Sequence, residues 1–358
     1  MKKMGSSQPS LFPEHTAIFP STRYQGSKAK IADWIWSEIA ELNFKTCLDA
    51  FGGTGAVAYR LKQAGKQVTY NDLLKFNYYF GLAIIENSHI KLSDEQTEWI
   101  LQKHSGINYP CFIQNTFKDI YFTEQENQWL DQTITNIKHI KNPYKIALAF
   151  FALCQACIIK RPYNLFHRKN LYIRLANVER SFGNKTTWDR PFEEWFRIFI
   201  EEVNNAVFDN GQKNRALNSD ACEVSGEYDL VYIDPPYISK NGVGVDYLDF
   251  YHFLEGLTMY YEEWHQRIDY KSKHRRLKLL KNPWNDPKEI FKAFDRLFNR
   301  FRESILVVSY RSDGIPNEQQ LVSLLKKYKK TVTLKHFGRY KYVLSKNNDS
   351  KEILLIGN

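Results

Sequence analysis

The chain has 358 residues, of which 43% are hydrophobic and 15% aromatic, and it carries a formal net charge of +10. That length can bury one large core, or a core and a second domain, and the basic balance favours a polyanionic partner, nucleic acid first. No stretch is long and uncharged enough to span a bilayer and the polar N-terminus lacks a secretory apolar region, so we expect a cytoplasmic protein with no membrane partner.

The first motif, RYQGSK at residues 23–28, precedes an apolar stripe with helical spacing over residues 31–39. Ser27 is a natural N-cap residue and predicts that this helix begins directly after it. The free N–H groups of a helix start, together with the charge of Lys28, would hold a carboxylate or a phosphate. The plainer interpretation is a capped surface helix.

A glycine-rich turn follows in the sequence CLDAFGGTGAV of residues 47–57. The order is a strand end, the acid Asp49, the turn, and a helix over 56–63 that Gly65 stops. It resembles a dinucleotide fingerprint only superficially, because the phosphate-binding spacing is not matched and Asp49 would repel a pyrophosphate. A cofactor with a cationic amine or a sulfonium, and no phosphate, suits the turn better.

A second strand is predicted over residues 67–70 and ends in Asn71-Asp72. Asp72 lies roughly twenty residues beyond the glycine turn, where a carboxylate can bind ribose hydroxyls. It can also cap the largely apolar segment 73–85. Together, the glycine turn and Asp72 predict a nucleoside-type site.

The alternation of strands and helices disappears between residues 86 and 212. Ser93 with Gln96, and Thr123 with Glu126, form capping boxes that predict helix starts. A buried apolar helix is expected over residues 144–159. An insert of this length between strands of one sheet predicts a separate lobe.

The five cysteines are an odd, sparse set, which argues against a disulfide framework and for a reducing compartment. Cys154 and Cys157 form a CxxC pair inside the apolar helix. Since no second pair or histidine pair completes a zinc site, we expect a structural helix face and no metal.

Basic and aromatic side chains interleave over residues 160–174, as needed to bind phosphates and stack on bases. A second, denser basic run covers residues 271–278. A solvated surface is the alternative interpretation of both segments. The side chains predicted to contact a nucleic acid are Lys160, Arg161, Arg168, Lys169, Arg174, Lys273, Arg275 and Arg276.

Strand and helix patterns return after residue 212. Asp220, in the loop before the next strand, can accept a hydrogen bond from an adenine amino group or serve as a plain loop acid. The run 230–233 predicts a buried parallel strand, and strands are also expected over 304–309, 331–337, 340–344 and 352–356.

The glycine-containing loop 238–246 can order on substrate binding. His252, which follows this loop, is expected to be structural.

The strand 230–233 ends in Asp234-Pro235-Pro236-Tyr237. Two prolines prevent its continuation and leave a rigid turn at the carboxyl end of the strand, where open α/β sheets bind ligands. The amino group of a nucleobase is a poor nucleophile because its lone pair is delocalised into the ring. The Asp234 carboxylate and the Pro235 carbonyl can bind its two hydrogens, while Tyr237 stacks on the base. A plain strand-to-loop turn is the alternative.

The ordered set RYQGSK, DAFGGTGAV, ND, a long insert and DPPY resembles the Dam-like alpha group of adenine-N6 DNA methyltransferases. Within that group, YISKNGVGVDYLDFYHFLEGL and SYRSDGI are similar to modification enzymes of restriction systems. The resemblance covers residues 23–88 and 216–358. It implies an α/β fold, with a Rossmann-like sheet that binds S-adenosylmethionine over residues 1–88 and 213–358 and a mainly helical target-recognition insert over 89–212.

The resemblance also implies roles for single residues. Those matching the cofactor motifs are Tyr24, Gly26, Lys28, Asp49, Phe51, Gly53, Gly55, Asp72 and Asp220, with the first three near the methionine carboxylate. Those matching the catalytic motif are Asp234, Pro235, Pro236 and Tyr237.

We therefore predict a site-specific DNA adenine-N6 methyltransferase that acts on an adenine flipped out of duplex DNA. A restriction endonuclease acting separately is a possible companion. The alternatives are an enzyme acting on RNA or on cytosine N4, a catalytically inert DNA-binding protein, and a nicotinamide dehydrogenase. The last is disfavoured by the missing phosphate turn.

Overall fold

The computed structural model describes residues 17–177, 185–339 and 350–358. In these residues one sheet has the strand order β3-β2-β1-β4-β5-β7-β6. Five strands are mutually parallel: β1 (Thr46–Asp49), β2 (Gln67–Asn71), β3 (Arg215–Leu217), β4 (Leu230–Ile233) and β5 (Ile305–Arg311). β7 (Lys351–Gly357) runs antiparallel between β5 and β6 (Val332–Arg339). The α/β, Rossmann-like sheet is thus confirmed; the predicted strand 340–344 lies outside the described residues.

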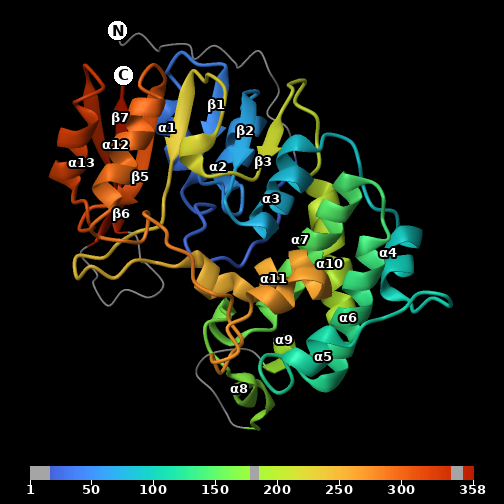
Figure 1. The fold of residues 1–358 in the computed structure, drawn as a ribbon. Coiled ribbons are helices and arrows are strands. Elements are labelled where there is room, and N and C mark those ends of the chain that lie inside the picture. Colours follow the sequence, from blue (N-terminus) through green and yellow to red (C-terminus); the bar gives the residue numbers. More distant parts are fainter. Residues whose placement is uncertain (1–16, 178–184, 340–349) are drawn as a thin grey trace.

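Helices cover both faces of the sheet (Figure 1). Leu230 and Tyr232 of β4 pack in one apolar cluster with α1 (Ala32–Ile39), α2 (Ala56–Gln63) and α3 (Lys75–Gly81), which a π-helical turn, η1 (Leu82–Glu86), extends. Val231 and Ile233 point to the other face and pack with α12 (Ile290–Arg300) and α13 (Glu318–Leu325). Alternate residues of a strand face opposite sides, so a strand buried on both faces is apolar throughout.

Most remaining helices gather on one side, below the carboxyl ends of the strands in the view of Figure 1. They are α4 (Asp94–Leu101), α5 (Phe112–Thr116), α6 (Glu124–Lys138), α7 (Pro143–Ile159), α8 (Leu171–Leu175), α9 (Lys185–Asp189), α10 (Phe192–Ala206) and α11 (Tyr247–Arg267), with a 3₁₀ turn, η2, at Pro162–Asn164. Both capping boxes are present at the starts of α4 and α6, as predicted. We call this group the helical lobe.

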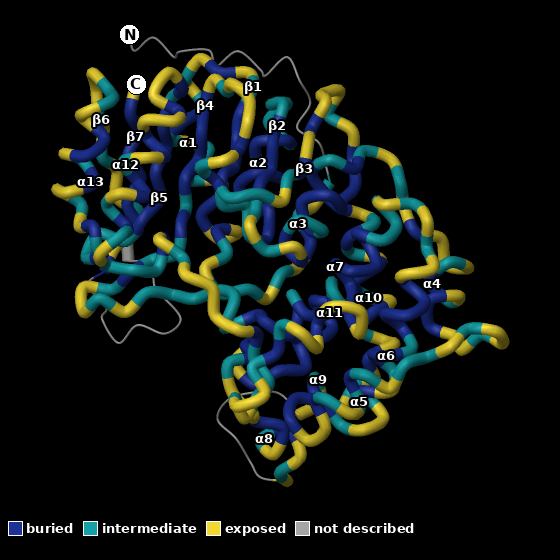
Figure 2. Tube along the Cα trace, in the orientation of Figure 1, coloured by how far each residue is buried: buried dark blue, intermediate teal, exposed yellow. Residues whose placement is uncertain are grey.

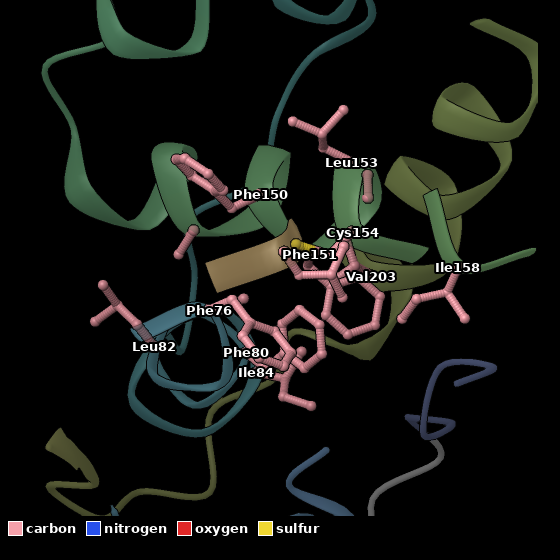
Figure 3. Packing of buried hydrophobic residues seen from close by; sticks show 14 of the residues in the cluster. Phe76, Phe80, Leu82, Ile84, Phe150, Phe151, Leu153, Cys154, Ile158 and Val203 are labelled. Carbon is pink, nitrogen blue, oxygen red and sulfur yellow. The ribbon is translucent and has the colours of Figure 1, made fainter. Parts of the chain in front are cut away.

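The helical lobe shares one apolar cluster with the sheet. Phe80 of α3 packs on Phe151 of α7 with ring centroids 4.9 Å apart (Figure 3). Tyr79 of α3 stacks on Phe150 of α7 at 4.6 Å. Figure 2 shows that most of α7 is buried. The predicted domain boundaries at residues 89 and 212 therefore do not coincide with a break in packing. The target-recognition role of the insert between them stays a prediction.

The lobe is also built from two separate parts of the chain, because α11 comes from beyond residue 212. Tyr260 of α11 donates a hydrogen bond to Asp131 of α6 at 2.7 Å. The buried His252 lies 2.7 Å from the Tyr121 hydroxyl, within the lobe, as expected of a structural histidine.

The predicted start of the first helix is wrong. The N-cap of α1 is Ile31, and its side chain makes no capping bond. The Ser27 hydroxyl instead lies 3.1 Å from the Thr54 hydroxyl in the glycine turn, and residues 28–31 form a separate turn closed by Ile31 N to Lys28 O at 2.9 Å. Ser27 Oγ also accepts from Ala29 N at 3.4 Å, so its local bond lies in this turn and not at the start of α1.

Candidate active site

A cavity of about 510 Å³ lies between the carboxyl ends of the strands and α11. Its lining includes ten of the predicted site residues: Tyr24, Gly26, Lys28, Asp49, Phe51, Gly53, Asp72, Asp220, Asp234 and Pro236. Gly55, Pro235 and Tyr237 are not among the described residues that line it. The motifs, spread over more than 200 positions in the sequence, therefore converge on one cavity.

The glycine turn is held against β2 by Tyr70. A Cβ on Gly52 would lie 2.0 Å from the Tyr70 ring, so no larger residue fits there. The Tyr70 hydroxyl donates to Gly53 O at 2.7 Å, and Gly53 N donates to Asp72 at 2.9 Å. Gly55 has φ of +80° and immediately precedes α2, which begins and ends where predicted. The turn is thereby fixed at the cavity wall.

Asp49 is a buried carboxylate whose Oδ1 has no hydrogen-bond partner among the described residues. Burial, followed by the charges of Asp234 and Asp72, raises the pKa of Asp49 to about 8. A buried carboxylate oxygen without a hydrogen-bond donor is costly, and a cationic group in the cavity would relieve that cost. The residues present therefore fit a ligand with a positive charge.

Asp72 and Glu255 lie along the same wall. Burial raises the pKa of Asp72 to about 6, although its carboxylate accepts from Gly53 N and from Leu74 N at 2.8 Å. Asp72 does not cap α3, because the N-cap residue is Leu74 and the first N–H groups of α3 donate to Glu255 of α11. Burial raises the pKa of Glu255 to about 7. Glu255 was not predicted, since its partner is 180 positions away.

Tyr24 and Asp220 occupy other parts of the lining. The Tyr24 ring is stacked between Tyr251, at 4.5 Å, and Tyr247, at 5.5 Å. Gly26 beside it has φ of +81°, which favours glycine, and a Cβ there would also lie 2.3 Å from the Tyr247 hydroxyl. The Asp220 side chain accepts from Cys222 N at 2.8 Å, in the 3₁₀ turn η3 (Ala221–Glu223).

The Asp234 carboxylate follows β4 and binds two donors through Oδ1. Lys28 Nζ donates at 2.8 Å and the Tyr237 hydroxyl at 2.8 Å. The ammonium of Lys28 therefore contacts the predicted catalytic acid in this structure, and not only the cofactor region. Burial raises the pKa of Asp234 to about 6, against the lowering effect of Lys28.

Tyr237 is anchored by residues of two neighbouring strands, β5 and β7. Its ring packs edge-to-face on Tyr310 at 4.8 Å, and its hydroxyl oxygen also lies 2.6 Å from Glu352 Oε1 on β7. Glu352 was missed by the sequence analysis. The available signal was a single acid inside the apolar strand 351–357, where an unpaired charge would be costly.

Three of the eight predicted nucleic-acid contacts are wrong for this structure, because the side chains are buried inside the helical lobe. Lys160 and Arg174 both bind Glu126, at 2.9 and 2.6 Å. Arg161 donates to Tyr121 O at 3.2 Å and to Arg168 O at 3.1 Å. These cations hold the lobe together.

Replacing Glu126 by glutamine is expected to destabilise the protein by about 3 kcal/mol, because two buried cations lose their anion. Burial would raise the pKa of Glu126, but Arg174 and then Lys160 lower it overall, so the difference from wild type should shrink as the pH falls through that lowered pKa. Urea unfolding would measure this. Glu124→Gln, on the exposed side of the same helix start, is the control; equal unfolding of both variants would refute the prediction.

The other five predicted contacts remain accessible. Arg168, Lys169 and Lys273 are exposed, and Arg275 and Arg276 are half-buried. The second basic run forms a hairpin, closed by a bridge between Ile268 and Leu277. The Tyr121 hydroxyl lies 2.6 Å from Phe166 O and 2.8 Å from His274 O, which holds the two basic segments side by side.

Neither a membrane span nor a metal site emerges from the described part of the chain. No helix there is long and apolar enough to cross a membrane. No group of three or more His, Cys, Asp or Glu residues in those ranges has the arrangement to hold a metal ion.

Comparison with known proteins identifies relatives over most of the chain. Type II methyltransferase M2.HphI of Haemophilus parahaemolyticus is 28% identical over 348 residues, 94% of this chain and 97% of that protein. Type II methyltransferase M.FokI of Planomicrobium okeanokoites is 28% identical over 86% of this chain, and modification methylase StsI of Streptococcus sanguinis is 26% identical over 93%. The chain spans 47% and 51% of the length of these last two relatives.

The alignment with a solved structure, the rRNA methyltransferase aviRa from Streptomyces viridochromogenes, covers 96% of this chain and 90% of the aviRa chain at 12% sequence identity. The TM-score of 0.29 is too low to establish a shared fold. The decisive match is to a family model over residues 24–313, which includes the glycine turn, the helical lobe and the DPPY turn. The chain therefore belongs to the family of D12 class N6 adenine-specific DNA methyltransferases.

Proposed function

We propose that this enzyme transfers a methyl group from S-adenosylmethionine to N6 of an adenine at one recurring sequence in duplex DNA, and that the adenine leaves the base stack to react. One observation carries the proposal. The Asp234 carboxylate, at the carboxyl end of β4, lines the same cavity as the Asp49 carboxylate, whose Oδ1 has no hydrogen-bond partner among the described residues. Asp234, as acceptor for the target amine, and Asp49, as acceptor for a cationic ligand, thus lie on the wall of one cavity.

S-adenosylmethionine, when bound, would supply an electrophilic methyl group on a positively charged sulfur. Asp49 would face its positive charge, Asp72 its ribose hydroxyls and Asp220 its adenine amino group. Tyr24 and the turn at Gly26 would border its methionine end. The raised pKa values of Asp49 and Asp72 support a cationic ligand, because such a ligand favours the ionised carboxylates.

Asp234 would direct the amine of the target adenine. Since its Oδ1 already accepts from Lys28 and Tyr237, Oδ2 would bind one amine hydrogen, and the Pro235 carbonyl would have to turn towards the cavity to bind the other. Binding both hydrogens turns the nitrogen lone pair towards the methyl donor, largely by positioning and electrostatics. A pKa of about 6 also suits Asp234 to take the proton that the methylated nitrogen releases.

Duplex DNA would dock on the two basic segments that Tyr121 joins. Replacing Arg168 or Lys273 by alanine is expected to weaken DNA binding at 100 mM salt several-fold at every sequence and to reduce the salt slope by about 1, because each cation releases a counterion from a phosphate. Fluorescence anisotropy over a salt series would measure both quantities. Lys292→Ala, an exposed cation on α12, is the control; a slope unchanged in the test variants excludes this surface.

Three further assignments belong to the same proposal. The order of the motifs supports membership of the Dam-like alpha group. The names of the relatives support a role as the modification enzyme of a restriction system, with a separate endonuclease as its companion. A DNA substrate and free cysteines support a cytoplasmic location.

The test is methyl transfer from labelled S-adenosylmethionine to unmethylated bacterial DNA, followed by base analysis and sequencing of the modified positions. We expect N6-methyladenine at one recurring sequence. Incorporation into RNA alone, or into cytosine, would overturn the assignment of substrate. Cofactor binding without any incorporation would point to an inert DNA-binding protein.

A further inference from the structure

Glu352, which belongs to none of the sequence motifs, lies beside the predicted catalytic acid. It sits on β7, next to β5 in the sheet (Figure 1), and its side chain is fully buried. A buried carboxylate is tolerated only where donors or cations surround it. Glu352 has such partners on three other segments: Ser309 Oγ at 2.5 Å, Tyr237 OH at 2.6 Å and Lys28 Nζ at 3.6 Å.

The Tyr237 hydroxyl lies between two carboxylates, 2.6 Å from Glu352 Oε1 and 2.8 Å from Asp234 Oδ1. A phenol has one proton and donates it to one acceptor at a time. Lys28 also binds both acids and donates to the phenol oxygen at 2.7 Å. The hydrogen bonding and charge of Asp234 therefore depend on whether Glu352 is present.

Glu352 cannot act by touching a ligand, because it is not among the described residues that line the cavity. Its effect on a ligand would pass through Lys28 and Asp234, which both line the cavity. Without the Glu352 carboxylate, Tyr237 and Lys28 would both direct their protons to Asp234. A carboxylate with more donors and less net negative charge around it is a weaker acceptor for a further amine.

We propose that Glu352 is a positioning residue for methyl transfer, which anchors the Tyr237 hydroxyl and shares the Lys28 ammonium so that Asp234 keeps its capacity to bind the target amine. The inference rests on the proposed function and adds to it a residue that no motif marks. It also accounts for the presence of an acid in the apolar strand β7.

The electrostatics agree with this geometry. Burial is the main cause of the raised pKa of Asp234; Lys28 opposes it, and the charge of Glu352 adds to it. The other ionisable groups around the pair are Asp49, whose pKa is raised, and the buried phenol of Tyr232. Arg311, opposite Glu352 in the register of β5 and β7, binds Asp313.

The test compares wild type with Glu352→Gln. We expect kcat for methyl transfer to fall about ten- to a hundredfold while KM for DNA and for S-adenosylmethionine stays within about threefold. The acid limb of the pH–kcat profile should move below its wild-type midpoint, because the loss of a like charge lowers the pKa of Asp234. A residue that only supports the fold would not move that limb.

Two further variants separate anchoring from charge. Glu352→Asp keeps the charge but shortens the side chain, so kcat should fall while the acid limb stays in place. In a Tyr237→Phe background, which lacks the shared hydroxyl, Glu352→Gln should cost much less than in wild type. Glu318→Gln, a half-buried acid on α13 that pairs with His336, is the control and should behave as wild type.

The outcomes are distinguishable. A wild-type enzyme that methylates no adenine overturns the proposed function. An active wild type with an unchanged kcat and acid limb in Glu352→Gln overturns the inference alone. If Glu352→Gln does not fold by thermal melting, Glu352→Asp decides, and a folded Glu352→Asp enzyme with wild-type kcat overturns the inference.

Discussion

Replacing Asp234 by alanine is expected to lower kcat for methyl transfer by about a thousandfold and to leave the affinity for S-adenosylmethionine within about threefold. The reason is geometric. Asp234 lines the cavity at the end of β4, with one oxygen committed to Lys28 and Tyr237 and the other available for an amine. Without it, the lone pair of the adenine nitrogen is no longer turned towards the methyl donor.

Single-turnover kinetics with labelled cofactor, together with calorimetric cofactor titration, would measure the two effects separately. Asp234→Asn tests the charge at nearly constant size and should also be strongly impaired, because an amide is a weaker acceptor for the amine. Asp295→Asn, at an exposed ion pair on α12, is the control. Near-wild-type activity of Asp234→Ala would defeat the assignment of the catalytic turn.

Replacing Asp49 by asparagine is expected to weaken S-adenosylmethionine binding by about thirtyfold, the size of one lost charged contact. Asp49 has an unpartnered oxygen in the buried wall of the cavity, so it is the acid best placed to face a cation. Wild-type binding should strengthen as the pH rises towards 8, because the ionised form binds the cation and the pKa of Asp49 in the free protein is about 8. The variant should lose that dependence.

The same substitution is expected to stabilise the ligand-free protein at neutral pH. Because its pKa is raised in the folded state, Asp49 contributes stability that is fully present below its unfolded pKa of ~4 and is lost as the pH rises to about 8, by at most about 1.4 kcal/mol per pH unit. Thermal melting of both proteins across this range would show a gap that widens with pH. Equal melting curves, or tighter cofactor binding by the variant, would refute the role of Asp49.

Contacts within a few residues were predictable from the sequence. The helix α2 begins at Ala56 and ends before Gly65 because the turn glycine and the stop glycine act on their own neighbours. The strand β4 and its end at the two prolines follow from an apolar run and from backbone chemistry. The capping boxes of α4 and α6 are likewise local. The order of these elements was enough to predict the sheet and its ligand edge.

Burial of charge was not predictable in the same way. Lys160 and Arg174 lie in a basic, aromatic segment that has the composition of a nucleic-acid surface, yet both bind Glu126, which lies 34 and 48 positions away. Ser27 has the chemistry of a helix cap, but Thr54 lies close enough to take its hydroxyl. In each case a distant partner competes with the local pattern, and only the folded chain decides which contact forms.

The residue types of the site, the glycine turn and the DPPY turn were thus determined by the sequence alone, because each is a local arrangement of backbone and side chains. The tertiary structure decided what surrounds them. It placed Glu352 of β7 beside Tyr237 and Glu255 of α11 at the start of α3, across 115 and 180 positions. Sequence order carries no record of such distances, since the pairing of strands and the packing of helices bring these acids to one site.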